Sequence, residues 1–428
     1  MRVPAFEALL TGAGRDVLAS VDAEAASRDA LAAASRLRED PRVAALDPGL
    51  PVSELVNAVL TQISLRVRGR AKFGPRADLM FFTPNGLEQS TRASVAAYRA
   101  ERVAAVHRGP AGDLCCGIGA DLLALAARGV PVEGVDLDPL TVAVAGANVA
   151  ALGLQDTARV REGDVTRIGP GAYPLLVCDP ARRGGRGRVF DPAAYSPPWD
   201  VAVGLAGGSG AACLKAAPGI PHEVLPPGAD TEWISVDGEL KEAALWFGAL
   251  SGGPRRRATA LSERDGSRTH LDEVPGLGPA PVAPARRYLY DPDPAVVRSH
   301  LVAEAAARVD GALLDERIAY FTADTAVRSP LWRVLEVEEV VPFSLKRVRA
   351  ALRERRVGTV TVMKRGSAVD TEKLRRDLRA SGPEAATVVL TRVGERPFAL
   401  LCREPSAAPG EAGEAGEAGE AGEAGAAR

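Results

Sequence analysis

The segment from Asp113 to Asp179 constrains the fold of this 428-residue chain more than any other. It contains four short motifs, and each one ends or follows an apolar run that predicts a buried strand. In doubly wound sheets the ligand binds at the carboxyl ends of such strands, so the motifs are expected to meet at one site. They read DLCCGIG (113–119), GVDLD (134–138), EGDV (162–165) and VCDPAR (177–182).

The first motif predicts a glycine turn between a strand and a helix. Residues 114–116 are expected to end the strand, and Gly117 and Gly119 open the turn into a helix over 120–127. Glycine suits this place because a ligand that approaches the backbone leaves no room for a Cβ, and because the turn can require a positive φ. A lone glycine turn is weak evidence for nucleotide binding.

Acidic residues end the strands that follow. Asp136 ends the strand predicted for 132–135, seventeen residues after Gly119, close to the offset at which a carboxylate meets ribose hydroxyls. The alternative is that Asp136 or Asp138 caps the helix that begins at Pro139, and both interpretations can hold, one for each aspartate.

The third and fourth motifs repeat the pattern. Asp164 follows the strand predicted for 158–161, and its place beside Val165 suits a contact to the edge of a base. Asp179 closes the strand predicted for 175–178. Four consecutive strands that each end in an acid exceed what helix capping usually demands.

The spacing of apolar residues along the chain changes several times and predicts several domains. Residues 1–105 carry apolar residues at helical spacing and predict a helical N-terminal domain. The β/α alternation covers 106–273, and a linker rich in proline and glycine follows at 274–286. Mixed helices and strands occupy 287–403. The GEA repeat in 404–428 has no hydrophobic face, and we expect it to be disordered.

Within these domains some elements can be predicted individually. Helices are expected over 17–37, 295–309 and 344–355, and strands over 357–363 and 386–391. A turn at Gly394 and a final strand predict a closing β-hairpin.

Composition excludes several classes of protein. No apolar run approaches the roughly 20 residues that span a bilayer, and the N-terminus lacks an export signal, so we expect a cytoplasmic protein without a membrane partner. The five cysteines form no CxxC pair and the four histidines are scattered, which argues against a disulfide framework and a zinc site. The sequence predicts no bound metal and does not indicate an oligomeric state.

Taken together, DLCCGIG, VDLD, GDV and CDPAR resemble the motifs of class I methyltransferases that use S-adenosylmethionine. The turn lacks the third glycine of the dinucleotide fingerprint, which suits a cofactor without pyrophosphate. The resemblance implies an α/β fold with a Rossmann-like seven-stranded methyltransferase domain. It assigns the methionine and ribose end of the cofactor to Asp113, Cys115, Gly117 and Gly119. It assigns the ribose hydroxyls to Asp136, the adenine face to Leu137, and the adenine edge to Asp164 and Val165.

The whole layout resembles a bacterial methyltransferase family with an α+β, THUMP-like C-terminal domain. In related nucleic-acid methyltransferases the region before the first strand folds over the cofactor, which makes Phe82, Thr83 and Gln89 candidates here. The alternative is that Gln89 merely lies near a helix start. The segments that carry this resemblance are FFTPNGLEQSTR (81–92), CLKAAPGIP (213–221), WISVDGELKEAALWFG (233–248), YLYDPDPAVVRSHL (288–301) and VPFSLKRVRAALRER (341–355).

The segment after the fourth strand normally contacts the acceptor. It makes Asp179, Pro180 and Arg182 candidates for the catalytic site. Amino-group methyltransferases of bases often have two prolines and an aromatic residue there, and the departure at Ala181 and Arg182 puts an amine target in doubt. The SPPW pattern at 196–199 is an alternative source of a stacking tryptophan, Trp199.

Two further side-chain types bear on catalysis. Lys215 interrupts an apolar strand near its end, which places an ammonium at the site or lets it reach the surface. Cys178 and Cys213 lie in apolar strands and lack the electropositive, exposed setting that a nucleophilic thiolate requires.

Basic residues favour a polyanionic partner. Arginines cluster at 182–188 and at 255–257, and residues 342–403 contain fifteen Lys and Arg against six Asp and Glu. Charged helix faces are usually only solvated, but THUMP-like modules are associated with RNA binding in better-known relatives. The preferred hypothesis is S-adenosylmethionine-dependent methyl transfer to a nucleotide of a structured RNA. The alternatives are a methyltransferase for a protein or small metabolite, and a non-catalytic module that binds cofactor or RNA.

Overall fold

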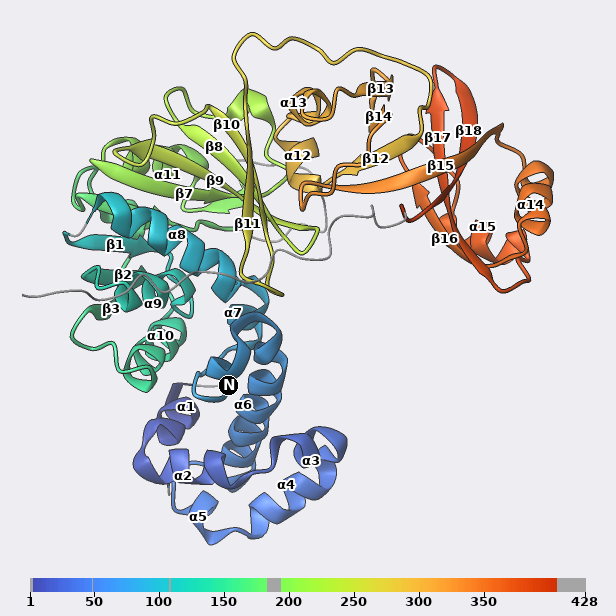
Figure 1. The fold of residues 1–428 in the computed structure, drawn as a ribbon. Coiled ribbons are helices and arrows are strands. Elements are labelled where there is room, and N and C mark those ends of the chain that lie inside the picture. The colour runs from blue at the N-terminus through green and yellow to red at the C-terminus, as the bar shows by residue number, and fades with distance from the viewer. Residues whose placement is uncertain (1–2, 48, 108, 183–193, 406–428) are drawn as a thin grey trace, which may run out of the picture. The chain divides into compact units, whose positions relative to one another are not determined.

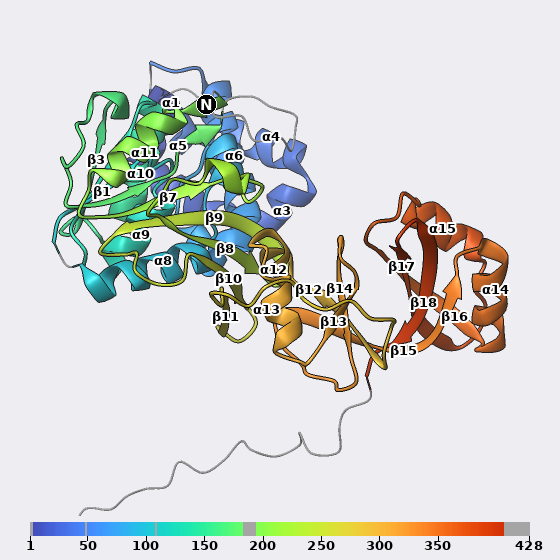
Figure 2. The ribbon, with the colours of Figure 1, turned by 90° about the horizontal axis from the view of Figure 1, so that it is seen from above.

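A computed structural model describes residues 3–47, 49–107, 109–182 and 194–405, and Figures 1 and 2 show its ribbon from two sides. Arg183, Arg186 and Arg188 of the predicted basic cluster and most of the predicted disordered tail lie outside these residues. None of the helices in the described ranges is both long and apolar enough to cross a membrane.

The chain forms two compact units. The first contains the residues up to Gly278 together with 293–305, and the second contains 279–292 and the residues from Ala306 onward. The chain therefore returns to the first unit after the predicted linker, which differs from the single domain expected over 287–403.

The N-terminal part of the first unit is helical. The helical stretch expected over 17–37 consists of the end of α2, α3 and α4, because aspartates interrupt it as N-caps. The Asp22 side chain accepts hydrogen bonds from the backbone N–H groups of Glu24 and Ala25, and Asp29 accepts one from Ala32. The six helices are α1 (Val3–Leu10), α2 (Gly12–Ser20), α3 (Ala23–Arg28), α4 (Ala30–Glu39), α5 (Pro41–Ala44) and α6 (Val52–Phe73).

A connecting segment joins α6 to the sheet. It contains the 3₁₀ helix η1 (Gly74–Asp78), α7 (Pro84–Gln89) and α8 (Ala93–Val106). Gln62 of α6 fixes this segment, because its amide donates to the Phe82 carbonyl at 2.7 Å and accepts from the Phe82 N–H at 3.0 Å.

A nine-stranded sheet lies in the rest of the first unit. Its order is β11-β10-β8-β9-β7-β4-β1-β2-β3, with β9 antiparallel to both neighbours and β11 antiparallel to β10. Seven strands, from β3 to β8, make the predicted Rossmann-like sheet, and β10 and β11 extend it. The strands are β1 (Ala111–Leu114), β2 (Val132–Asp136), β3 (Ala158–Glu162), β4 (Leu175–Cys178), β7 (Ala211–Ala216), β8 (Asp230–Val236), β9 (Glu239–Gly248), β10 (Arg256–Leu261) and β11 (Arg268–Asp272).

The register of this sheet brings the predicted motifs together. Leu114 of β1 pairs with Val135 of β2 and with Cys178 of β4, so the residues after these strands lie side by side. β1 ends at Leu114 rather than at Cys116 as predicted, because Cys115 has a φ of +59°. The helices that connect the strands are α9 (Ala120–Ala127), α10 (Pro139–Ala151) and α11 (Trp199–Gly207).

Short elements complete the first unit. β5 (Ala181–Arg182) and β6 (Tyr195–Ser196) form a separate antiparallel pair, and η2 (Val165–Arg167) and η4 (His222–Val224) are 3₁₀ turns. After the linker, α12 (Pro294–Arg298) packs against β8, β9 and β10. The helix predicted for 295–309 is thus α12 and a separate α13 (Val302–Ala307), because His300 between them has a φ of +58°.

The second unit is α+β. Its sheet has the order β13-β14-β12-β15-β18-β17-β16, and β17 and β18 form the hairpin predicted around Gly394. Two helices, α14 (Leu345–Glu354) and α15 (Thr371–Leu378), pack against each other. The strands are β12 (Tyr288–Pro292), β13 (Ala312–Asp315), β14 (Ile318–Ala323), β15 (Trp332–Pro342), β16 (Val357–Lys364), β17 (Glu384–Val393) and β18 (Arg396–Arg403).

Candidate active site

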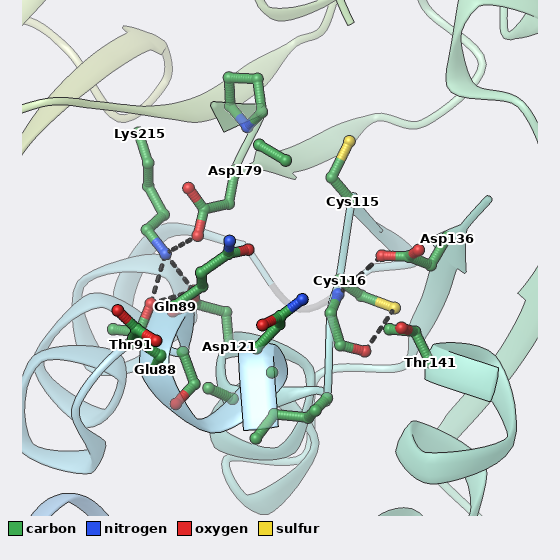
Figure 3. A pocket seen from close by; sticks show the side chains of 18 of the residues that line it. Glu88, Gln89, Thr91, Cys115, Cys116, Asp121, Asp136, Thr141, Asp179 and Lys215 are labelled. Carbon is green, nitrogen blue, oxygen red and sulfur yellow. Dashed lines mark hydrogen bonds and ion pairs between the residues drawn. The ribbon is translucent and has the colours of Figure 1, made fainter. Parts of the chain in front are cut away.

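A cavity of about 790 Å³ lies where β1, β2, β4 and β7 end, and the segment around α7 forms another part of its wall (Figure 3). The carboxyl ends of parallel strands are where ligands bind in this type of sheet. The structure brings nine predicted site residues to this cavity, namely Thr83, Gln89, Asp113, Cys115, Gly117, Asp136, Asp179, Pro180 and Lys215.

The glycine turn leaves one side of the cavity open. Gly117 has a φ of +56°, and a Cβ built there would meet no protein atom within 4 Å. Gly119 has a φ of +90° and begins α9 without lining the cavity. The turn therefore offers backbone that a ligand can approach closely.

Asp138 caps a helix, as one of the two interpretations predicts, and Asp136 lies in different surroundings. The Asp138 carboxylate accepts from the Thr141 N–H at 3.0 Å and caps α10. Asp136 instead faces the glycine turn, where it accepts from the Gly117 N–H at 3.0 Å and from the Asp138 N–H at 3.1 Å. Each oxygen of Asp136 keeps acceptor capacity for a further donor, such as a ribose hydroxyl.

Asp113 presents an unsatisfied polar atom in the cavity wall. Its side chain is buried, and its Oδ2 has no hydrogen-bond partner among the described residues. Burial, with the nearby Asp121 carboxylate, raises the pKa of Asp113 well above its usual range. A buried polar atom without a partner is costly, and a ligand ammonium group would satisfy it. Together with the open turn and the free capacity of Asp136, this atom fits S-adenosylmethionine, whose methionine part carries an ammonium.

Lys215 lies in the wall of the same cavity. Its Nζ donates to Asp121 Oδ2 at 3.1 Å and also to Asp179 Oδ2 and Thr91 Oγ1, as the dashed lines of Figure 3 show. Lys215 is thus held at the site, which decides between the two placements predicted for it.

The charge of Lys215 follows from its surroundings. Burial alone would lower the pKa of Lys215, but the carboxylates of Asp121 and Asp179 more than offset it and raise the pKa above its ordinary value. Lys215 therefore stays an ammonium at neutral pH and cannot take up a proton. Arg99 of α8 completes the buried network, because its guanidinium bonds to Asp121 and to Glu242 of β9.

The α7 segment is fastened to α6 by a lysine. Lys72 Nζ donates to the carbonyl oxygens of Leu87 at 2.7 Å, Glu88 at 2.6 Å and Ser90 at 2.8 Å. At the other end of α7, Thr83 accepts from the Gly86 N–H at 2.9 Å and caps the helix. Both ends of this part of the wall are thus held by side chains that also line the cavity.

Other predicted site residues lie away from the cavity wall. The Phe82 side chain is buried and packs on Phe73, with ring centroids 5.6 Å apart. Leu137 is exposed, and Val165 is buried. Asp164 caps η2 by accepting from the Thr166 N–H at 2.9 Å.

The acceptor segment is described in part. Arg182 belongs to β5, where its backbone pairs with Tyr195, and the structure does not describe its side chain. Trp199 of the SPPW pattern is buried as the first residue of α11, and its ring lies 5.5 Å from that of Tyr195. Tyr195, which sequence patterns do not single out, lines the cavity in its place.

Comparisons with known proteins agree with this geometry. Two relatives from Mycobacterium tuberculosis, strains CDC 1551 / Oshkosh and ATCC 25618 / H37Rv, are each 38% identical over 324 residues, which cover 73% of this chain and 85% of the relative. Both are described as uncharacterized S-adenosylmethionine-dependent methyltransferases. The chain therefore belongs to the S-adenosylmethionine-dependent methyltransferases. It is an enzyme that uses this cofactor as its methyl donor.

Two family models and one solved structure add detail. A model described as THUMP domain-like matches residues 332–404, and a model for a domain of unknown function matches residues 2–69. The crystal structure of a protein from Porphyromonas gingivalis W83, proposed to be a methyltransferase, is 20% identical with a TM-score of 0.68. It covers 87% of this chain and 96% of that protein. The predicted fold class, with its THUMP-like C-terminal domain, is confirmed.

Proposed function

We propose that the methyl group is transferred to a nucleotide of a structured RNA. The observation that carries this proposal is a group of exposed cations on α14, on α15 and just after each helix. Their side chains have no hydrogen bond and no ion pair among the described residues. We call this group the basic helix face; it consists of Lys346, Arg347, Arg353, Arg356, Lys373, Arg376 and Arg379.

The packing of the two helices explains why these cations face outward. α14 buries Val348, Ala351 and Leu352, and α15 buries Leu374 and Leu378. The polar sides of both helices are left for solvent or a ligand.

Other arginines of the same unit form ion pairs with glutamates, unlike the cations of the basic helix face. Arg355 lies 2.9 Å from a carboxylate oxygen of Glu339, and Arg403 lies 3.0 Å from one of Glu336. The only exposed acids within α14 and α15 are Glu354 and Glu372. An excess of unpaired like charge on one surface is the electrostatic footprint of a nucleic-acid site, and the THUMP-like match covers this part of the chain.

Methyl labelling tests the proposal. Purified protein is incubated with S-adenosylmethionine labelled in the methyl group and with fractions of RNA, protein and small metabolites from a strain that lacks the enzyme. We expect label in the RNA fraction, abolished when the RNA is digested beforehand. Label in the protein or metabolite fraction alone would contradict an RNA acceptor.

A further inference from the structure

The carboxylate of Asp179 offers one free oxygen to the cavity. Asp179 directly follows β4, and its side chain is 39% exposed, whereas that of Lys215 is 6% exposed. Lys215 occupies Oδ2, and Oδ1 has no hydrogen-bond partner among the described residues. An ionised carboxylate oxygen can only accept hydrogen bonds. The free oxygen therefore suits a ligand group that donates a hydrogen.

The orientation of this carboxylate depends on Lys215. Thr91 and Asp121 bind the same ammonium, and Arg99 in turn binds Asp121. Besides Asp179, an oxygen atom from the segment between α7 and α8 and one from α9 thus fix the position of Nζ. Asp179 cannot rotate Oδ2 away without losing a charge-assisted hydrogen bond to a buried partner.

We propose that Asp179 Oδ1 accepts the hydrogen of the atom that becomes methylated, and that Lys215 is the positioning residue that holds Asp179 for this task. The methylated atom is then a nitrogen or an oxygen that carries a hydrogen, and not a carbon. The proposal rests on the proposed function only for the choice of RNA as the test substrate.

With these residues, the bonds, electrons and protons of the methyl transfer can all be accounted for. S-adenosylmethionine supplies, when bound, a methyl group on a sulfonium, and the sulfur keeps the electron pair of the C–S bond that breaks. The lone pair of the acceptor nitrogen or oxygen forms the new bond to the methyl carbon. Asp179 Oδ1 takes the proton that this atom loses and passes it to water. Lys215 remains an ammonium throughout.

Two cysteines in the strands next to the acceptor segment, Cys178 and Cys213, do not supply the nucleophile that methylation of carbon needs. Methylation of a pyrimidine carbon requires a thiolate nucleophile near the acceptor. Burial raises the pKa of Cys213 to about 12, and a hydrogen bond with Cys115, together with burial, raises that of Cys178 above its ordinary value. Neither thiol is ionised at neutral pH.

Three variants test the roles of Asp179 and Lys215. Asp179→Asn keeps the shape of a partly exposed side chain and leaves an oxygen for Lys215, so it should fold. Lys215→Met removes the ammonium, and Lys215→Arg keeps a cation. The matched control is Arg161→Met, which removes an ion pair to Glu133 between β2 and β3, outside the cavity lining.

Single-turnover methyl transfer is measured with labelled cofactor and total RNA from the strain that lacks the enzyme. Asp179→Asn and Lys215→Met should each slow the reaction about 100-fold at saturating RNA, the lower range for removing a general base. Binding of S-adenosylhomocysteine should be unchanged in both, and Lys215→Arg should recover most of the rate. Crystals of the Met variant should show Asp179 rotated, and those of the Arg variant should show it in place.

The methylated product decides the central claim. Nucleoside analysis should find the label on nitrogen or oxygen. Label on carbon, or full activity in Asp179→Asn, would overturn the proposal, and an unmoved Asp179 with full activity in Lys215→Met would overturn the role of Lys215. If label enters protein or metabolites and not RNA, the proposed function fails, and the same variants and product analysis apply to the fraction that is labelled.

Discussion

At the scale of single residues, Asp136 gives the sharpest test of the cofactor site. Asp136→Ala should weaken binding of S-adenosylhomocysteine by about 1.5–3 kcal/mol, the usual contribution of hydrogen bonds to a charged group. The carboxylate faces the open glycine turn and has acceptor capacity left for ribose hydroxyls. Isothermal titration calorimetry measures the change.

Two controls accompany this variant. Asp136→Asn keeps one acceptor oxygen and should lose less affinity. Asp156→Ala changes an exposed aspartate in the α10–β3 connection, outside the cavity lining, and should bind like the unaltered protein. An affinity of Asp136→Ala equal to that of Asp156→Ala would remove Asp136 from the ribose site.

The same scale shows which site residues a sequence can reveal. Asp113, Gly117 and Asp136 could be predicted because each belongs to a short motif at a strand end, where local pattern and position coincide. Lys72 and Tyr195 could not, because neither belongs to a motif: Lys72 comes from the end of α6, and Tyr195 only precedes the SPPW pattern. Such residues are brought in by tertiary packing, which local patterns do not encode.

At the scale of elements, Lys72 is expected to hold α7 in the cavity wall. Lys72→Met leaves three carbonyl acceptors at the end of α7 without their ammonium donor. Hydrogen bonds to a charged donor contribute about 1.5–3 kcal/mol, and the half-exposed position of the ammonium places the loss at about 1 kcal/mol. Hydrogen–deuterium exchange of residues 84–92 should therefore become several-fold faster, while exchange in β4 stays unchanged. Equal exchange in α7 would show that other contacts hold it.

The basic helix face gives the second prediction at this scale. The double variant Lys346→Ala/Arg347→Ala removes two unpaired cations at the start of α14. If both contact phosphates, the slope of log affinity against log salt should become less steep by about 1.4–1.8. Filter binding with the labelled RNA fraction at several salt concentrations measures this slope.

The matched control for this slope removes cations that already have partners. Arg287→Ala/Arg317→Ala takes away two exposed arginines of the same unit, which pair with Glu336 and Glu316. This double variant should leave the slope unaltered. If both double variants change the slope equally, the unpaired cations have no special role in RNA binding.

Element boundaries were harder to predict than element types, for a local reason. The helices expected over 17–37 and 295–309 both have the right periodicity, yet each is interrupted. Asp22 and Asp29 end helical runs by capping the next helix, and His300 does so by a positive φ. The aspartate side chains compete with the helix for backbone N–H groups, and at His300 the backbone itself turns. The spacing of apolar residues reveals neither effect.

At the scale of the whole molecule, the chain returns to the first unit after the predicted linker. Composition indicates a linker at 274–286 but cannot show that residues 293–305 belong to the first unit, where α12 packs against β8, β9 and β10. Four apolar residues in this stretch are buried, namely Ala295, Val296, Leu301 and Ala305. Two hydrogen bonds support them, between His222 and the Arg298 carbonyl at 2.8 Å and from Arg256 to the Ser299 carbonyl at 3.2 Å.

This return predicts where the chain can be shortened. A chain that ends at Ala305 keeps the stretch, whereas a chain that ends at Gly278 exposes the strands beneath it. Burial of Val296 and Leu301 contributes about 3–6 kcal/mol, and the chain that ends at Gly278 loses this contribution. The longer chain should therefore unfold at higher urea concentration and at a temperature several degrees higher. Val296→Ala in the full chain should reproduce part of the loss. If the two shortened chains unfold at the same urea concentration, residues 293–305 do not stabilise the methyltransferase unit.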